Sequence, residues 1–276
     1  MLTPSTESLP DIQNTSDHRG ITLEQVGITD LRYPITVLDR AQGQQRTIAT
    51  LTMSVCLPHH FKGTHMSRFV EILNHYRGEF TMRTLPDLLH EMKQRLEAAA
   101  ARIEIHFPYF LERTAPVSGM KALMDYQCTF IGESNGSTDD FVLGVRVPVA
   151  SLCPCSKEIS EYGAHNQRGE VDIMVRSVRD QHGHPEIIWI EELIQIAEEA
   201  ASAPLYPLLK RPDERFVTMQ AYDNPAFVED ITRDVAVQLR ADERIAWFQV
   251  RVTNYESIHN HNAFASTSWS RQQVSS

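Results

Sequence analysis

The two halves of the chain carry the same order of hydrophobic patterns. Between residues 33 and 131, two runs of alternating apolar and polar residues come first. Two stretches with apolar residues at helical spacing follow, and two more alternating runs end the segment. The same order returns from residue 141 onward. Alternation at every second residue is typical of a half-buried strand, and a repeat near 3.6 residues is typical of an amphipathic helix. The pattern therefore predicts an α+β fold with antiparallel sheets backed by helices.

The expected elements can be placed by residue number. Strands are expected at 33–38, 47–57, 101–110, 121–131, 141–149, 170–178 and 245–255, with one more after His259. Helices are expected at 66–76, 86–101, 189–202 and 221–240, the last of them starting near Pro225. Sheets of this kind leave open edges that invite pairing with other chains. We therefore expect the chain to assemble into a ring of identical copies.

Composition narrows the class of protein. The 276 residues, 42% of them hydrophobic, suffice for one large domain or two ordinary ones. A net charge of −10 argues against a general nucleic-acid binder, which needs a basic face. Four cysteines without disulfide-like spacing, no signal-peptide pattern and no long apolar stretch predict a cytoplasmic protein that does not span a membrane.

Residues 147–170 hold a concentration of reactive side chains. Cys153, Cys155 and His165 lie in a polar stretch directly after an alternating run. Thiolate and imidazole are preferred ligands of zinc-like ions, but a closed structural site needs four ligands. The other thiols, Cys56 and Cys128, each stand alone in a strand-like run. The cluster thus favours a metal with an open position over a structural site, and a tight turn with one buried thiol is the alternative.

Further ligands are sought nearby. Glu199 lies on the expected helix 189–202, on the side away from its apolar residues, and Glu198 is its alternate. His259 is a candidate fourth ligand or proton carrier, with His261 as its rival.

Six motifs in order connect the chain to a known family. They lie at residues 9–21 (LPDIQNTSDHRGI), 62–73 (KGTHMSRFVEIL), 151–169 (SLCPCSKEISEYGAHNQRG), 190–214 (IEELIQIAEEAAS with LLKRPDE), 221–230 (AYDNPAFVED) and 254–265 (NYESIHNHNAFA). Through them the chain resembles the prokaryotic type IB GTP cyclohydrolases. The resemblance implies a tunnelling fold of two tandem ββααββ units, at residues 21–133 and 134–276 behind an N-terminal arm at 1–20. It also implies assembly into a homotetrameric barrel with sites at subunit interfaces.

The same resemblance implies a reaction. GTP and water would give 7,8-dihydroneopterin triphosphate and formate, the first step of folate-type pterin biosynthesis, with one divalent metal per site, zinc, manganese or iron. The metal role passes to Cys153 and His165, with Glu199 and His259 as the further ligands. The proton transfers of the later steps need nearby donors and acceptors, for which the candidates are His165, Cys155, Glu256 and His259.

Substrate contacts are assigned in the same way. By its position in LLKRPDE, Glu214 is expected to accept the two adjacent N–H donors of guanine, with Asp213 as its alternate. The family commonly has an acidic residue where this chain has Met219. For the triphosphate, Lys157 and Arg168 are favoured among several cationic sets. The other sets are Lys62, His65 and Arg68, and Lys210 with Arg211.

Two other functions fit the same residues. A tunnelling-fold nitrile reductase would use Cys155 as a nucleophile with NADPH as reductant. A non-catalytic oligomeric metal-binding protein would need only the ligands. No GxxxxGK[ST] loop is present, which excludes a P-loop GTPase.

Overall fold

The computed structural model describes residues 11–271 except 14, 77–79, 82–83, 137 and 182, so residues 1–10 of the expected arm lie outside it. In chain order the elements are β1 (Leu23–Asp39), β2 (Gly43–Leu57), α1 (Met66–Tyr76), α2 (Leu85–Arg95), β3 (Ala100–Thr114), β4 (Lys121–Asn135), β5 (Thr138–Leu152), α3 (Pro154–Ile159), β6 (Asn166–Ser177), α4 (Ile190–Ala200), β7 (Ala203–Pro204), α5 (Arg211–Asp223), α6 (Val228–Ala241), β8 (Ile245–Asn254) and β9 (Ala263–Ser270). The predicted order, strand-strand-helix-helix-strand-strand, is confirmed in the first half. The second half follows it with additions: the short helix α3 lies between β5 and β6, and the short strand β7 and the helix α5 lie between α4 and α6.

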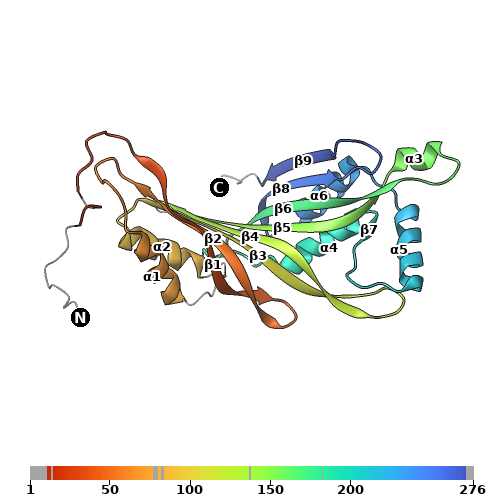
Figure 1. Cartoon of the computed structure of the whole chain (residues 1–276), viewed down its shortest axis with the longest axis horizontal. Coiled ribbons are helices and arrows are strands. Elements are labelled where there is room, and N and C mark those ends of the chain that lie inside the picture. The colour runs from red at the N-terminus through yellow and green to blue at the C-terminus, as the bar shows by residue number, and fades with distance from the viewer. Residues whose placement is uncertain are drawn as a thin grey trace, which may run out of the picture.

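All the strands belong to one antiparallel sheet, in the order β1-β2-β3-β4-β5-β6-β8-β9, with β7 added beside β5 (Figure 1). The halves join where β4 pairs with β5, in register from Gln127 with Arg146 to Asn135 with Thr138. The sheets of the two units are thus continuous. The outermost strands β1 and β9 each have a neighbour on one side only, which leaves two open edges.

One side of this sheet carries the core. A row of paired buried residues crosses it from β2 to β8 and consists of Leu51, Ile105, Phe130, Leu143, Val175 and Phe248. Paired residues in neighbouring strands point to the same face. Helices of both halves add their apolar residues to this single cluster, among them Phe69 and Leu89 from the first half and Leu193 and Val235 from the second. The predicted backing of the sheet by helix pairs is confirmed.

Several predicted boundaries are wrong. The helix expected at 86–101 ends at Arg95, because Glu97 adopts the left-handed backbone conformation (φ 51°) that stops a helix. Within the segment 221–240, the helix expected to start near Pro225 starts at Val228 as α6, and residues 221–223 are the end of a separate helix, α5. Proline has no backbone N–H and disfavours helical geometry in the residue before it. Pro225 therefore separates two helices and does not start one.

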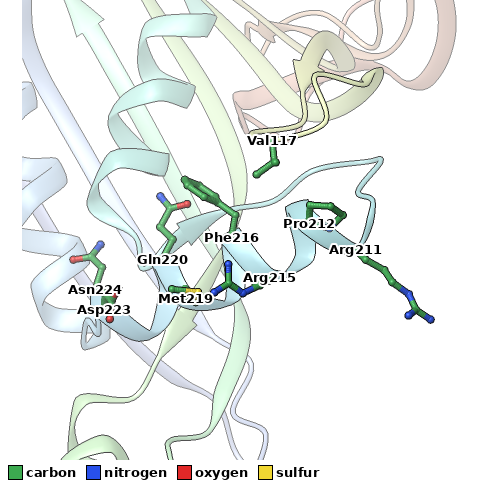
Figure 2. Close-up of a pocket in the computed structure, with 9 residues that line it drawn as sticks. All are labelled: Val117, Arg211, Pro212, Arg215, Phe216, Met219, Gln220, Asp223 and Asn224. Carbon is green, nitrogen blue, oxygen red and sulfur yellow. The ribbon is translucent and has the colours of Figure 1, made fainter.

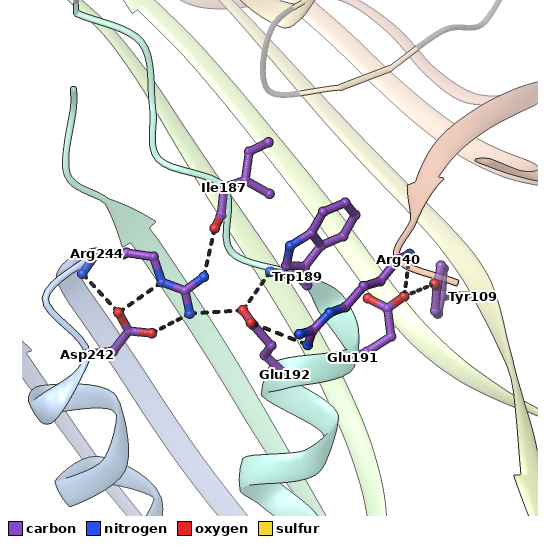
Figure 3. Close-up of polar contacts among 8 residues, drawn as sticks. All are labelled: Arg40, Tyr109, Ile187, Trp189, Glu191, Glu192, Asp242 and Arg244. Carbon is purple, nitrogen blue, oxygen red and sulfur yellow. Dashed lines mark hydrogen bonds and ion pairs between the residues drawn. The ribbon is translucent and has the colours of Figure 1, made fainter. Parts of the chain in front are cut away.

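A polar network ties the halves together on the helix side (Figure 3). The Glu191 carboxylate at the start of α4 accepts hydrogen bonds from the Arg40 N–H (2.8 Å) and the Tyr109 hydroxyl (2.7 Å), both in the first half. Burial and the neighbouring Glu191 raise the pKa of Tyr109, so it stays a neutral donor. Glu192 pairs with Arg244 at 2.9 Å, and Arg244 also pairs with Asp242 at 2.7 Å. The start of α4 is therefore fixed to both halves of the sheet.

Candidate active site

Cys153 and His165 meet at one end of the sheet because they flank neighbouring strands. Cys153 follows β5 and is the N-cap of α3, and His165 directly precedes β6. The Cys153 N–H donates to the His165 carbonyl at 3.1 Å. Pro154 starts α3, a position where its missing N–H costs nothing. The structure thus places the backbones of the two residues side by side, and the prediction that their side chains serve one site stays a prediction.

The imidazole of His165 is oriented by two polar side chains. Its Nδ1 lies 2.9 Å from Gln167 Oε1 and 3.3 Å from Ser257 Oγ. Partners at Nδ1 leave Nε2 as the nitrogen available to a metal or substrate, in the way that outer-shell groups orient ligand histidines. Sequence reasoning missed both partners. The signal was present for Ser257, which lies inside the motif NYESIHNHNAFA.

The other expected ligands do not join this pair within one chain. Among the described residues, no group of three or more His, Cys, Asp and Glu side chains is placed to hold a metal. Glu199 is exposed on α4 and accepts from Gln195 at 2.7 Å. His259 and His261 are exposed, with their rings stacked 5.1 Å apart. In the described part of the chain, Cys153 and His165 are therefore a thiol and an imidazole without a third such side chain placed beside them to hold a metal.

Glu198, the alternate to Glu199, is committed to a different role. It is 9% exposed, its Oε2 lies 2.6 Å from Arg113 Nη2, and its Oε1 accepts from the Tyr126 hydroxyl at 3.1 Å. Burial raises the pKa of Glu198, against the opposing effect of Arg113 and the Tyr126 hydrogen bond. This buried pair connects α4 to β3 and β4.

Buried polar groups hold the strand end behind Cys153. Ser151, fully buried, receives a hydrogen bond from Asn254 Nδ2 at 3.0 Å and donates one to the Ala226 carbonyl at 3.1 Å. The Leu152 N–H donates to Ser202 Oγ at 3.0 Å. These contacts join β5 to β8 and to the segments flanking α4 and α6. No local sequence pattern identified these contacts, because each joins residues 50 to 103 positions apart in the chain.

The other expected site residues have mixed surroundings, both in residues 147–170, here called the cysteine segment, and near His259. Cys155 and Arg168 are exposed, and Glu256 is half-buried next to Ser257. Lys157 donates from Nζ to the Tyr222 carbonyl at 2.5 Å and lies 4.3 Å from the centre of the Tyr222 ring. Lys157 thereby ties α3 to the end of α5.

A pocket of about 910 Å³ runs along α5 (Figure 2). Val117, from the connection between β3 and β4, faces one side of the helix there. Its other lining residues are Arg211, Pro212, Arg215, Phe216, Met219, Gln220, Asp223 and Asn224. The pocket combines apolar side chains with the guanidinium of Arg215 and the carboxylate of Asp223, and the Arg211 guanidinium points away from the other lining residues. The pocket reaches the end of α5, to which Lys157 attaches the cysteine segment.

The two acidic residues at the start of α5 differ in their surroundings. Glu214 is exposed and is not among the pocket-lining residues. Asp213 is fully buried, and its carboxylate accepts from the Val117, Ser118 and Lys210 N–H groups and from the Ser118 hydroxyl. These hydrogen bonds hold the pKa of Asp213 well below its usual range. Its acceptors are thus occupied by the fold, which leaves Glu214 as the freer of the two.

His65 and Arg68 lie far from Cys153 along the molecule. Figure 1 shows α1 at one end of the sheet and α3 at the other. His65 Nε2 lies 3.2 Å from Asp11 Oδ2, and Arg68 Nη1 donates to the Arg95 carbonyl at 2.8 Å. The segment around Asp11 is held to the loop before α1 by the backbone bonds from Lys62 N–H to Thr15 O and from Gly63 N–H to Gln13 O, both 3.1 Å.

Comparison with known proteins identifies the family. A family model described as type I GTP cyclohydrolase FolE2 matches residues 9–265. The chain belongs to the type I GTP cyclohydrolase FolE2 family. A relative named GTP cyclohydrolase FolE2 from Syntrophotalea carbinolica is 55% identical, with 92% of this chain and 93% of the relative covered. One of the same name from Geobacter metallireducens is 52% identical, with 94% and 96% covered. The resemblance seen in the six motifs is therefore confirmed.

Solved structures of low identity show the same fold. Uricase from Arthrobacter globiformis matches with a TM-score of 0.51 at 10% identity, over 90% of this chain and 94% of that one. Urate oxidase from Bacillus subtilis matches with a TM-score of 0.52 at 9% identity, over 90% and 98%. This chain thus has the predicted tunnelling fold. In the described part of the chain, no helix is long and apolar enough to cross a membrane.

Proposed function

We propose that the chain performs the reaction of its family, GTP cyclohydrolase activity, at a site organised by Cys153 and His165. GTP and water would yield 7,8-dihydroneopterin triphosphate and formate for folate-type pterin synthesis. The observation that carries the proposal is the backbone hydrogen bond that places Cys153, after the end of β5, beside His165, before the start of β6, in a member of the FolE2 family. The enzyme is on this basis a hydrolase acting on the C–N bonds of the guanine imidazole ring.

The donor set fits a divalent metal. Cys153 and the free Nε2 of His165 would hold it, and Glu199 and His259 are the proposed further ligands. A thiol with an imidazole favours zinc, whereas an added carboxylate would also suit manganese or iron. Bound there, such a metal lowers the pKa of water toward ~7 and polarises a carbonyl oxygen.

The chain's own side chains would bind the substrate and move its protons. His165, Cys155, Glu256 and His259 are the proposed proton donors and acceptors for formate release and for the rearrangement of the ribose. We assign the guanine edge to Glu214. Lys157, Arg168, His65 and Arg68 are assigned to the triphosphate.

These assignments require more than one copy of the chain. His65 and Arg68 lie at the opposite end of the sheet from Cys153, so a site that uses both ends has to combine two subunits. The open edges of β1 and β9 offer a means of assembly. We propose a homotetramer in the reducing cytoplasm, a location supported by the four free thiols.

Ligand deletions test the proposal. Cys153→Ala and His165→Ala should each lose metal and all turnover while the protein stays assembled, because an open site with one ligand fewer holds the ion weakly. Cys155→Ala is the matched control and should keep the metal. The measurements are metal content, oligomeric mass and formation of fluorescent oxidised neopterin from GTP. Full metal content in Cys153→Ala would remove that thiol from the site.

A further inference from the structure

Among the residues that the structure describes, Ser156 is the one with hydrogen bonds to both Cys153 and His165. Its hydroxyl donates to the Cys153 carbonyl at 3.1 Å and accepts from the His165 N–H at 3.2 Å. Its own N–H points to Cys153 Sγ at 3.5 Å. We propose that Ser156 is a positioning residue that sets the separation and orientation of Cys153 and His165. This inference rests on the proposed function of that pair as metal ligands.

The contacts form a closed ring of hydrogen bonds. The Cys153 N–H donates to the His165 carbonyl, and the His165 N–H is joined through the Ser156 hydroxyl to the Cys153 carbonyl. Both backbone groups of both residues are therefore engaged. One bond alone would act as a hinge about which the His165 backbone could tilt. The serine hydroxyl supplies the second attachment and removes that freedom.

Between Cys153 and His165, Lys157 anchors α3 to the Tyr222 carbonyl, but the residues that follow α3 add little support. Ile159 is 83% exposed and Tyr162 is 97% exposed, so neither side chain packs on the core. Gly163 has a φ of 118°, a backbone conformation that residues with a side chain rarely adopt. A segment with so few buried contacts takes its geometry from its hydrogen bonds. The position of His165 relative to Cys153 therefore depends on Ser156.

The role of Ser156 differs from that of the groups at the imidazole. Gln167 and Ser257 contact Nδ1 and orient the ring. Ser156 instead fixes the backbone from which the ring projects. A displacement of about 1 Å there would move the nitrogen relative to the thiol even with the ring contacts kept, and metal sites tolerate only small errors of this kind.

The test uses three serine substitutions in the full-length assembled protein. Ser156→Ala removes both hydroxyl contacts and leaves the N–H contact to the thiol. Ser156→Thr keeps the hydroxyl. Ser160→Ala is the matched control, because this serine lies in the same exposed segment and its hydroxyl only accepts from the Tyr162 N–H at 3.3 Å. Each protein is stripped with chelator and titrated with cobalt(II), and the thiolate-to-cobalt charge-transfer absorption reports on the Cys153 bond.

We expect Ser156→Ala to weaken cobalt binding about 10- to 100-fold, the range for loss of a group that orients metal ligands, and to change the charge-transfer absorption at full occupancy. Ser156→Thr and Ser160→Ala should bind like the parent protein. Equal affinity and spectrum in Ser156→Ala, or the same loss in Ser160→Ala, would overturn the inference. Cys153→Ala, measured in the same way, distinguishes a failure of the Ser156 inference from a failure of the proposed metal site. If Cys153→Ala binds cobalt with an unchanged spectrum, the proposed site itself is wrong.

Discussion

Replacement of Arg113 by Met should destabilise the protein in a pH-dependent way. Glu198 is 9% exposed and Arg113 is 19% exposed, with 2.6 Å between Nη2 and Oε2. Arg113→Met keeps most of the aliphatic volume but leaves a buried carboxylate with Tyr126 as its remaining partner. Breaking a buried ion pair by removing one partner costs ~3–5 kcal/mol. Because Arg113 is partly exposed, we expect the lower end, ~3 kcal/mol at pH 7.5.

The raised pKa of Glu198 decides whether the stability of the variant rises or falls with pH. Burial already raises the folded-state pKa of Glu198, and loss of the cation raises it further. Between the unfolded and folded pKa values the folded state then binds more protons, so stability falls as pH rises through this window. The penalty should be largest above the folded pKa and should shrink toward the unfolded value of 4.5, by at most about 1.4 kcal/mol per pH unit.

Urea unfolding followed by tryptophan fluorescence at pH 5.5 and 7.5, at one fixed protein concentration, measures both effects. Adding Glu198→Gln to the Arg113→Met background removes the buried charge and should restore part of the stability at pH 7.5. Metal content should not change in Glu198→Gln alone, because the structure gives this carboxylate to Arg113 and Tyr126. If Arg113→Met lowers the free energy of unfolding by less than ~1 kcal/mol, and equally at the two pH values, the argument that a buried charge is left unpaired is refuted.

Three further predictions concern the site and its supports. Glu214→Gln replaces an acceptor oxygen with a donor that would face the guanine N–H donors, so GTP binding should weaken by at least about tenfold while the metal content stays unchanged. The preference for GTP over ITP should shrink in a competition assay. An unaltered preference would mean that Glu214 is only a surface carboxylate. Gly169→Ala places a Cβ 2.6 Å from Asn254 Oδ1, so the melting temperature should fall, and an unchanged value would show that Asn254 can move aside. The pKa of Asp213 is depressed in the folded protein, so the stability that its carboxylate provides at neutral pH is lost as the pH falls below about 4. Asp213→Asn should therefore lower the melting temperature at pH 7 and make the melting temperature less dependent on pH in the acid range. Parallel curves of melting temperature against pH for the variant and the parent protein would contradict this prediction.

Much of the architecture follows from local periodicity. Alternation along 47–57 and 141–149 and helical spacing along 66–76 reflect burial on one side of an element, and burial is set by which residues are apolar. The prediction for 66–76 matches α1 residue for residue. The nearness of the Cys153 and His165 backbones could also be predicted from the sequence, because a short connection after a strand end returns the chain to the same place.

Other features depend on contacts between distant segments, which no local pattern encodes. The motif LLKRPDE gave no helical signal, yet Arg211–Asp223 is a helix because Pro212 suits a first turn and Asp213 is fixed by the connection between β3 and β4. Ser151 and Asn254 become a buried pair only when β5, β6 and β8 align. Sequence alone determined the main order of strands and helices and the nearness of Cys153 to His165, because these depend on near neighbours and on hydrophobic period. Tertiary structure decided which carboxylates are free, because Glu198 and Asp213 acquire partners from segments about 70 to 100 residues away that only folding brings within hydrogen-bond distance.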